Sequence, residues 1–417
     1  MTIITFVTPW YGPDAPGGAE AETRRLVGQL RRAGVPVEVL TTTTRDLYAD
    51  WGRSYYPAGA TEIDGVIVRR FPVQKRDRAA FDAVNARLMR GALVSAADER
   101  VYIEQMIRVP DLYEFMTREA GDRLYVFIPY LFATTYYGAQ VCPERSVVIP
   151  CLHDESYARL ALYREVLPRV QALVFHTEAE RALADRLFPG HAGQLREVLG
   201  EGVDTDALGD GDRFRRRHGL DGPLVLYAGR REPGKNTPLL LDAWARYWRG
   251  AGRARGARLV LLGPGDVALP ADIADGFLDL GFVPPQDKHD AYTAADVFCL
   301  PSVNESFSIA LMESWLAETP ALVHAGCAVT VEHCHNANGG LYFADHDEFA
   351  ATLDYLFDHP AAAAQMGRNG RAYVLSRYQW PSIIPRYRDL FARVLAGKET
   401  TDYTDFTDSF FKSVKSV

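Results

Sequence analysis

The feature that most constrains this chain is an alternation of short apolar runs with longer helical patterns, which occurs in two successive series. The first series opens with a β-branched run at Ile3 to Thr8, a helical pattern at Ala19 to Ala33 and a strand pattern at Val35 to Thr42. This order predicts parallel strands joined by right-handed crossovers. Later strand candidates in this series are Val66 to Arg70, Leu124 to Ile128, Ser146 to Cys151 and Leu173 to His176.

The pattern restarts after a polar stretch that runs from residue 204 to residue 222. The strand candidates of the second series are Leu224 to Ala228, Arg258 to Leu262, Asp279 to Phe282, the end of Ala294 to Leu300, Ala321 to His324 and Leu341 to Phe343. The 417 residues exceed the roughly 250–300 at which a single core stops growing. We therefore predict two doubly wound α/β domains at residues 1–204 and 205–378. A helical segment at 379–417 is expected to cross back to the first domain.

Composition excludes several classes of protein. Hydrophobic residues make up 47% of the chain and charged residues 24%, as in ordinary globular proteins. A net charge of −8 argues against binding of nucleic acid through the overall charge of the protein. Weak peripheral contact with an anionic membrane stays an open alternative. The opening residues lack the basic region of a signal peptide, and the five cysteines are an odd number. We expect a cytoplasmic protein with reduced thiols.

Three segments carry residues suited to chemistry. Gly17 and Gly18 stand where the first helix begins, and free N–H groups at such a terminus favour an anion. An isolated pair of glycines fits an ordinary surface loop equally well, and the dinucleotide fingerprint spacing is missing. In the second segment, a buried strand runs into a glycine turn with Arg230, Arg231 and Lys235, and such cations neutralise phosphate.

The third segment holds two carboxylates, Glu305 and Glu313, eight residues apart with apolar residues between them. With the second acid on a predicted helix, their separation is ~12 Å or less, too long for one shared proton or one metal ion. Such a spacing fits two ends of an extended ligand, such as a sugar and a ribose separated by a diphosphate.

The ordered set of segments resembles glycosyltransferase family 4, whose members are retaining enzymes with two Rossmann-like domains facing a cleft, the GT-B fold. The segments that carry this resemblance are Gly229-Arg230 with Lys235-Asn236, Leu261 to Gly265, Gly281 to Val283, Ala294 to Val297, and the Glu-x7-Glu pair Glu305 and Glu313. The resemblance implies transfer of a hexose-type sugar from a nucleoside diphosphate sugar to a hydroxyl acceptor. That acceptor could be a glycan, a lipid-linked sugar, a protein or a small metabolite.

The resemblance also implies roles for single residues. The catalytic set is His153, Arg230, Lys235 and Glu305, and the donor-binding set is Gly17, Gly18, Gly229, Val283, Ser306, Phe307, Ser308, Ile309 and Glu313. Arg230 and Lys235 would hold the diphosphate and stabilise the leaving nucleotide. Glu305 would contact the transferred sugar and Glu313 the ribose. Amides near Ser306 to Ser308, with the two glycines of the first loop, would meet the phosphates.

His153 follows a buried strand, at the edge where ligands of α/β sheets bind. Hydrogen bonding to the donor is a more natural role for it than general base catalysis, because in retaining transfer the leaving phosphate can itself take the acceptor's proton. The backbone around Val283 would contact the base of the donor nucleotide. The loop at His324 to Thr330 departs from the glycine-rich pattern of the family, which puts its donor contacts in doubt.

No metal and no cofactor are expected, because Arg and Lys supply the positive charge at the diphosphate. Cys327, His333, Cys334 and His335 fit no standard zinc spacing. Three Asp-x-Asp triplets, at residues 204–206, 210–212 and 345–347, match a metal motif that arises often by chance in an acidic chain. Two alternatives stay open: a non-catalytic subunit that binds nucleotide sugars, and a nucleotide-sugar epimerase of the same fold. The donor base, the sugar and the linkage are not determined by these motifs.

Overall fold

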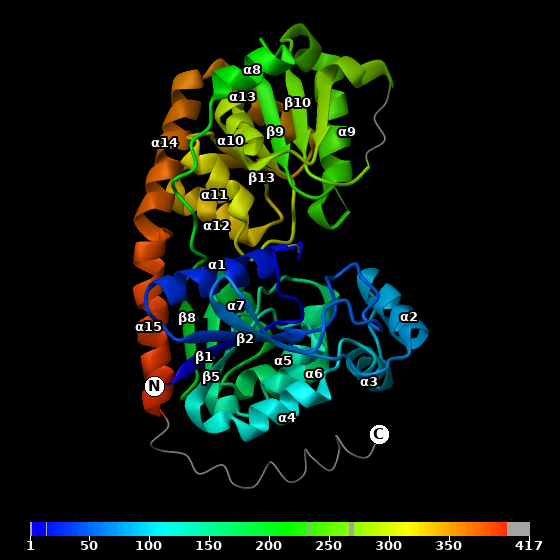
Figure 1. Ribbon diagram of the computed structural model, residues 1–417. Helices are drawn as coiled ribbons and strands as arrows, with labels where there is room; N and C mark the ends of the chain where they lie inside the picture. The colour runs from blue at the N-terminus through cyan, green and yellow to red at the C-terminus, as the bar shows by residue number, and fades with distance from the viewer. Residues whose placement is uncertain (1, 14, 232, 267–270, 398–417) are drawn as a thin grey trace. The chain divides into compact units, whose positions relative to one another are not determined.

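The computed structural model describes residues 2–13, 15–231, 233–266 and 271–397 (Figure 1). The chain divides into two compact units. The first contains the residues up to Gly202 and those from Ile383 onward, and the second contains Val203–Ser382. The boundary that the sequence predicts after residue 204 lies beside this division.

The first unit is built on an eight-stranded sheet in the order β3-β4-β2-β1-β5-β6-β7-β8. Its strands are β1 (Ile3–Val7), β2 (Val37–Thr42), β3 (Gly59–Ile63), β4 (Val66–Phe71), β5 (Arg123–Phe127), β6 (Ser146–Val148), β7 (Ala172–Phe175) and β8 (Leu195–Val198). All pairings are parallel except that of β3 with β4. The sequence patterns miss β3 and β8. β3 is largely exposed and β8 only half-buried, so neither presents a buried apolar run.

The helices of the first unit are α1 (Gly18–Arg32), α2 (Arg78–Met89), α3 (Ala96–Glu104), α4 (Pro110–Arg118), α5 (Ala133–Gly138), α6 (Ala161–Val166) and α7 (Glu178–Leu187). A large hydrophobic core lies between the sheet and α2 to α7 and is rich in aromatic rings. Trp10 contacts Trp51 and Phe132 there, with ring centroids 5.5 and 4.8 Å apart. This packing holds the loop that follows β1 against the core.

The second unit is built on a six-stranded sheet in the order β11-β10-β9-β12-β13-β14. Its strands are β9 (Leu224–Ala228), β10 (Arg258–Leu262), β11 (Phe277–Gly281), β12 (Val297–Leu300), β13 (Ala321–His324) and β14 (Gly340–Phe343). Its helices are α8 (Gly211–His218), α9 (Thr237–Tyr247), α10 (Pro285–Ala294), α11 (Ile309–Leu316), α12 (Ala328–Ala337), α13 (His346–Asp358) and α14 (Pro360–Arg377). Every strand pairing among its described residues is parallel, as the sequence predicts.

Each sheet has one point at which the strand order reverses. In the first unit β1 continues to β2 on one side, and the chain returns to place β5 on the other side of β1. In the second unit the same reversal places β12 beside β9. Ligands of open parallel sheets bind at such points, beyond the carboxyl ends of the strands.

The Asp-x-Asp triplets have structural roles. Asp210 caps α8 by accepting the N–H of Arg213, and Asp345 caps α13 by accepting the N–H groups of the residues two and three positions later. Asp204 accepts the indole N–H of Trp380 at 2.7 Å. The leading Asp of each triplet therefore accepts a hydrogen bond within the fold.

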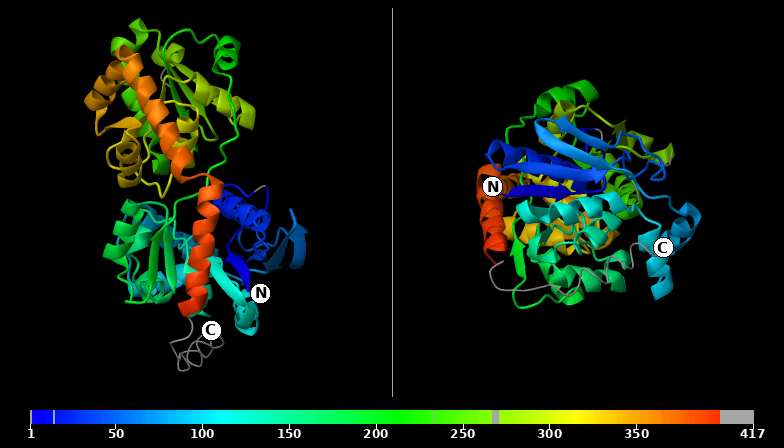
Figure 2. Two further views of the ribbon diagram at one scale, coloured as in Figure 1. Left: turned by 90° about the vertical axis from the view of Figure 1, so that its left-hand side faces the viewer. Right: turned by 60° about the horizontal axis from the view of Figure 1, so that its bottom comes forward.

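Helix α15 (Trp380–Ala396) begins in the second unit and continues in the first. Its later turns bury Tyr387, Leu390 and Val394, and the Arg386 guanidinium donates to the carbonyl of Leu199 at 2.8 Å. Figure 2 shows this red helix beside the strands of the first unit. In the described part of the chain, no helix has the length and apolar character needed to cross a membrane. The polar tail from Thr400 lies outside the described residues.

Candidate active site

Three glycines stand at the carboxyl ends of β9, β10 and β11. Gly229 donates its N–H to the carbonyl of Leu262 at 3.0 Å, and Gly263 donates to the carbonyl of Gly281 at 2.7 Å. Gly263 has φ +114°, and a side chain there would collide with the carbonyl of Gly229. Glycine is therefore required for the close approach of these loops at the edge of the sheet.

The two arginines that follow β9 have different surroundings. The Arg231 guanidinium is buried, forms an ion pair with Asp279 and also donates to the carbonyls of Leu261 and Gly265. Burial would raise the pKa of Asp279, but its bonds with Arg231 and the Gly281 N–H outweigh burial and lower that pKa. Arg231 thus stabilises the sheet. The neighbouring Arg230 is half-buried, and its carbonyl accepts the Tyr227 hydroxyl at 2.5 Å.

Lys235 and Glu305 are brought together by the tertiary structure. Lys235 lies in the turn before α9, and Glu305 lies in the loop between β12 and α11. The Lys235 Nζ donates to Glu305 Oε1 at 2.8 Å, with 25% and 11% of the two side chains exposed. Next to this pair, the Asn236 side chain donates to the carbonyl of Pro301 at 3.0 Å. Two loops from β9 and β12 are therefore fastened together at the point where the strand order reverses.

The segment Ser306 to Ile309 turns the chain into α11. Ser308 caps this helix with φ +76°, and its carbonyl accepts the N–H groups of Leu311 and Met312. The first N–H groups of the helix, starting at Ile309, have no intrahelical acceptor and favour an anion. The Phe307 ring is buried, 5.3 Å from the His333 ring and 4.9 Å from the Tyr378 ring between centroids. This ring anchors the loop, and the half-buried Ser306 precedes it.

Glu313, on α11, pairs with a lysine that the sequence motifs do not single out. The Lys288 Nζ on α10 donates to Glu313 Oε1 at 2.6 Å. The buried Tyr292, one turn further along α10, has a pKa raised well above its ordinary value by burial and by the Glu313 carboxylate. A lone lysine on a helix gives no signal in the sequence. The half-buried Val283 lies in the loop between β11 and α10.

In the first unit, Gly17 and Gly18 form the start of α1, as the sequence predicts. Gly17 has φ +129°, and a side chain there would collide with the buried carboxylate of Glu20. Gly18 is exposed, and a Cβ atom there would have no neighbour within 4 Å. Both follow β1, beside the reversal of strand order in this sheet.

His153 follows β6, two strands away from β1 in the same sheet. Its Nδ1 lies 3.8 Å from Glu155 Oε1, and 31% of its side chain is exposed. Burial raises the pKa of Glu155 to about 7. Glu155 was not predicted as a site residue. A single acid two residues from a histidine is too common a pattern to single it out.

The cysteines and histidines of α12 form no metal-binding group within the described residues. Cys327 and Cys334 are buried, and His335 is exposed. The His333 Nδ1 lies 3.0 Å from the Tyr373 hydroxyl inside an aromatic cluster. This segment therefore packs the core of the second unit.

The chain is similar to known proteins both in sequence and in fold. Residues 210–373 match the family described as glycosyl transferases group 1. The chain is 26% identical to D-inositol 3-phosphate glycosyltransferase of Saccharomonospora viridis, over 93% of this chain and 91% of the relative.

Among solved structures, sucrose-phosphate synthase of Thermosynechococcus elongatus has a TM-score of 0.71 at 18% identity, covering 95% of this chain and all of that one. HepE of Anabaena in complex with UDP has a TM-score of 0.67 at 15% identity, covering 94% of this chain and all of that one. These likenesses show the GT-B fold of two Rossmann-like domains. The second unit contains a domain that matches the family glycosyl transferases group 1. The protein is a glycosyltransferase with the GT-B fold.

Proposed function

We propose that this glycosyltransferase moves a hexose from a nucleoside diphosphate sugar to a hydroxyl acceptor with retention of configuration at the anomeric carbon. The transfer would need no metal ion, no other cofactor and no covalent enzyme intermediate. The proposal rests on the pairing of Lys235 with Glu305 at the strand-order reversal of the second unit. A diphosphate needs a cation to neutralise it, and the hydroxyls of the attached sugar need a hydrogen-bond acceptor such as a carboxylate. Both groups are expected beyond the carboxyl ends of the strands, where the strand order reverses.

Arg230 and Lys235 have the charge to bind the diphosphate. Negative charge grows on that group as its oxygen leaves the anomeric carbon, so cations held in place stabilise the transition state more than the ground state. The Glu305 carboxylate pairs with Lys235 and holds its ammonium group in position. The helix start at Ser308 and Ile309 would add backbone donors to the phosphates.

Glu305 and Glu313 have roles at opposite ends of the donor. We assign Glu305 to hydroxyl groups of the transferred sugar and Glu313 to the hydroxyls of the ribose. Each carboxylate is partly buried and held by a lysine, so each has a fixed direction from which to accept hydrogen bonds. Val283 lies in the loop after β11, near the helix that holds Lys288, and we assign its backbone to the base.

In the first unit, we assign phosphate contacts to the backbone at Gly17 and Gly18 and a donor hydrogen bond to His153. In the transfer step, the bond from the anomeric carbon to the diphosphate oxygen breaks. The acceptor oxygen forms its bond on the same face of the sugar. The leaving diphosphate takes the acceptor's proton, so that no side chain has to act as general base.

The relatives named D-inositol 3-phosphate glycosyltransferase suggest an acceptor to include in the test. Purified protein is incubated with UDP-, GDP-, ADP- and dTDP-sugars, each with D-inositol 3-phosphate, simple polyols and short glycans. Nuclear magnetic resonance then gives the anomeric configuration of the product. An axial donor sugar that yields an axial product supports the proposal.

Four outcomes contradict it. An inverted product excludes retention. Epimerised donor without any acceptor indicates the epimerase alternative. Nucleotide binding without transfer or donor hydrolysis across the panel indicates a non-catalytic subunit. Undiminished transfer after chelation supports the metal-independent step, and strict dependence on an added divalent ion would contradict it.

A further inference from the structure

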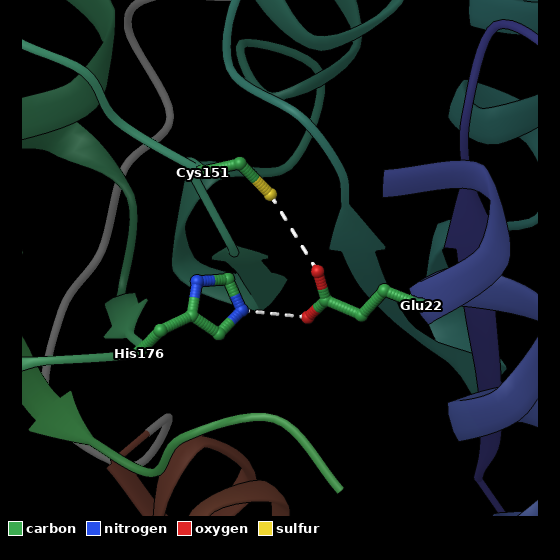
Figure 3. A group of neighbouring side chains, drawn as sticks. All are labelled: Glu22, Cys151 and His176. Carbon is green, nitrogen blue, oxygen red and sulfur yellow. Dashed lines mark hydrogen bonds and ion pairs between the residues drawn. The ribbon is translucent and has the colours of Figure 1, made fainter. Parts of the chain in front are cut away.

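A second group of chemically active side chains lies inside the first unit. Glu22 comes from α1, Cys151 follows β6 and His176 follows β7 (Figure 3). Each offers one donor atom, and the three donor atoms all lie within 4.8 Å of one another. Glu22 and His176 are buried, and Cys151 is half-buried. The three elements that meet here are separated by up to 154 residues in sequence.

One of the two spacings to Glu22 matches that of a metal site, and the other is at hydrogen-bond distance. His176 Nε2 lies 2.7 Å from Glu22 Oε1, and Cys151 Sγ lies 3.7 Å from Glu22 Oε2. In a tetrahedral zinc site, bonds of about 2.0–2.3 Å place neighbouring ligand atoms roughly 3.3–3.8 Å apart. A small outward rotation of the Glu22 carboxylate would open the required space.

The histidine is oriented as metal-binding histidines are. Its Nδ1 lies 3.4 Å from Glu180 Oε2, so its Nε2 is the atom that faces Glu22. Glu180 is itself fixed, because its two oxygens accept the N–H groups of Leu152 and His176, each at 2.6 Å. A carboxylate behind a ligating imidazole sets its tautomer and raises its basicity.

Two features are not explained by a simple His–Glu ion pair. Cys151 has φ +52°, a strained conformation for a residue with a side chain, and its thiol is directed at the Glu22 carboxylate. Tyr387, on α15, is 1% exposed, and its buried hydroxyl has no hydrogen-bond partner in the described structure. The groups that act on it electrostatically include Glu22, Glu201 and Cys151.

The other two carboxylic acids nearby, Glu180 and Glu201, already have partners. Glu201 forms an ion pair with Arg25 at 2.6 Å, which leaves Glu22 as the carboxylate that faces both the thiol and the imidazole. A thiolate, an imidazole and a carboxylate are together the ligands of zinc and similar divalent ions, and magnesium does not favour this set.

We propose that the first unit binds one zinc-class divalent cation through Glu22, Cys151 and His176. The fourth position would be filled by water or by the Tyr387 hydroxyl. On binding, the Cys151 thiol and the Nε2–H group of His176 each give one proton to solvent, and the imidazole binds the ion through the deprotonated Nε2. The ion would join α1 to the ends of β6 and β7 and so stabilise the start of α1. This role is structural and does not depend on the proposed sugar transfer.

The test uses the full chain, stripped with a chelator and titrated with Zn²⁺, Co²⁺ or Mg²⁺. We expect one Zn²⁺ per chain by elemental analysis, and a higher melting temperature with Zn²⁺ but not with Mg²⁺. With Co²⁺ we expect the near-ultraviolet band of a thiolate–cobalt bond. Cys151→Ser should remove this band and Glu22→Gln should weaken binding, while Cys142→Ser, a buried cysteine of the same unit, should retain one ion.

The cobalt spectrum of the unaltered protein keeps the test decisive if a variant fails to fold. No bound Zn²⁺ after titration, or a cobalt complex without the thiolate band, would overturn the proposal. Equal binding by Cys151→Ser and the unaltered chain would also overturn it.

Discussion

The Lys235 ammonium and the Glu305 carboxylate, 70 residues apart in sequence, are in contact at 2.8 Å between Nζ and Oε1. The contact spans the carboxyl ends of β9 and β12, where the order of strands reverses. Both side chains are partly buried, so the pair is screened less by solvent than a surface ion pair. It joins a residue assigned to the diphosphate with one assigned to the sugar.

Replacing Lys235 by Ala should lower kcat/KM by about 10²–10³, the usual effect of removing one group that stabilises charge in the transition state. Steady-state kinetics with the best donor measure this. Lys235→Arg should retain part of the activity, because it keeps the charge.

Arg217→Ala is the matched control for losing an ion pair, since Arg217 pairs with Asp287 on the surface of the same unit. Its activity and melting temperature should stay close to those of the unaltered protein. A Lys235→Ala variant that is as active as this control would remove Lys235 from the mechanism.

Arg230 and Arg231 are neighbours, yet their replacement should have different effects. Arg230→Ala should reduce turnover with little change in melting temperature. Arg231→Ala removes the buried partner of Asp279 and should lower the free energy of unfolding by about 2 kcal/mol, discounted because Asp279 is partly exposed. Thermal melting and kinetics on both variants separate the two roles. A stability loss in Arg230→Ala that matches that of Arg231→Ala would contradict this division.

Glu313→Ala should weaken binding of the free nucleotide by about 10–100-fold, because hydrogen bonds to a charged group contribute about 1.5–3 kcal/mol. Titration calorimetry with the nucleoside diphosphate measures this. Lys288→Met removes the lysine that pairs with Glu313 but keeps the carboxylate, so its nucleotide affinity is compared with that of Glu313→Ala. Unchanged affinity in Glu313→Ala would exclude the ribose role.

The two glycines at the start of α1 provide a matched pair of substitutions. Gly17→Ala should lower the melting temperature, because the new side chain would have an unfavourable φ and would collide with Glu20. Gly18→Ala adds a Cβ atom that has no neighbour within 4 Å, so it should leave stability unchanged and weaken donor binding only. Normal donor affinity in Gly18→Ala would indicate that this backbone does not approach the phosphates.

Glu155 should make stability depend on pH. Its pKa is raised from an ordinary 4.5 to about 7 in the folded protein, so the folded state holds the proton more tightly than the unfolded state. The stability contributed by this proton is present below pH 4.5 and is lost as pH rises through 7.

Glu155→Gln should therefore be more stable than the unaltered protein at pH 8, by about 2–3 kcal/mol, with the difference largely lost by pH 4.5. Denaturant unfolding at both pH values measures it. A difference that does not vary with pH would show that Glu155 titrates normally.

Much of the fold could be predicted from local patterns. The strands β9, β10 and β13 match their predicted ranges residue for residue, because each is a short, mostly buried apolar run next to clear turn or helix signals. β6 ends at Val148, earlier than the predicted Cys151, and the backbone turns to positive φ at Cys151. A period-two pattern does not reveal such a turn.

The sequence by itself determined the two α/β series, the placement of glycines and cations after particular strands, and the spacing of Glu305 from Glu313. These follow from local periodicity and from the requirement that parallel strands end at the same edge of a sheet. Only the tertiary structure decided that Arg231 is buried against Asp279, that Lys288 holds Glu313, and that Glu22, Cys151 and His176 meet. Side chains far apart in the chain are brought together by packing of whole elements, and no local pattern of residues encodes that packing.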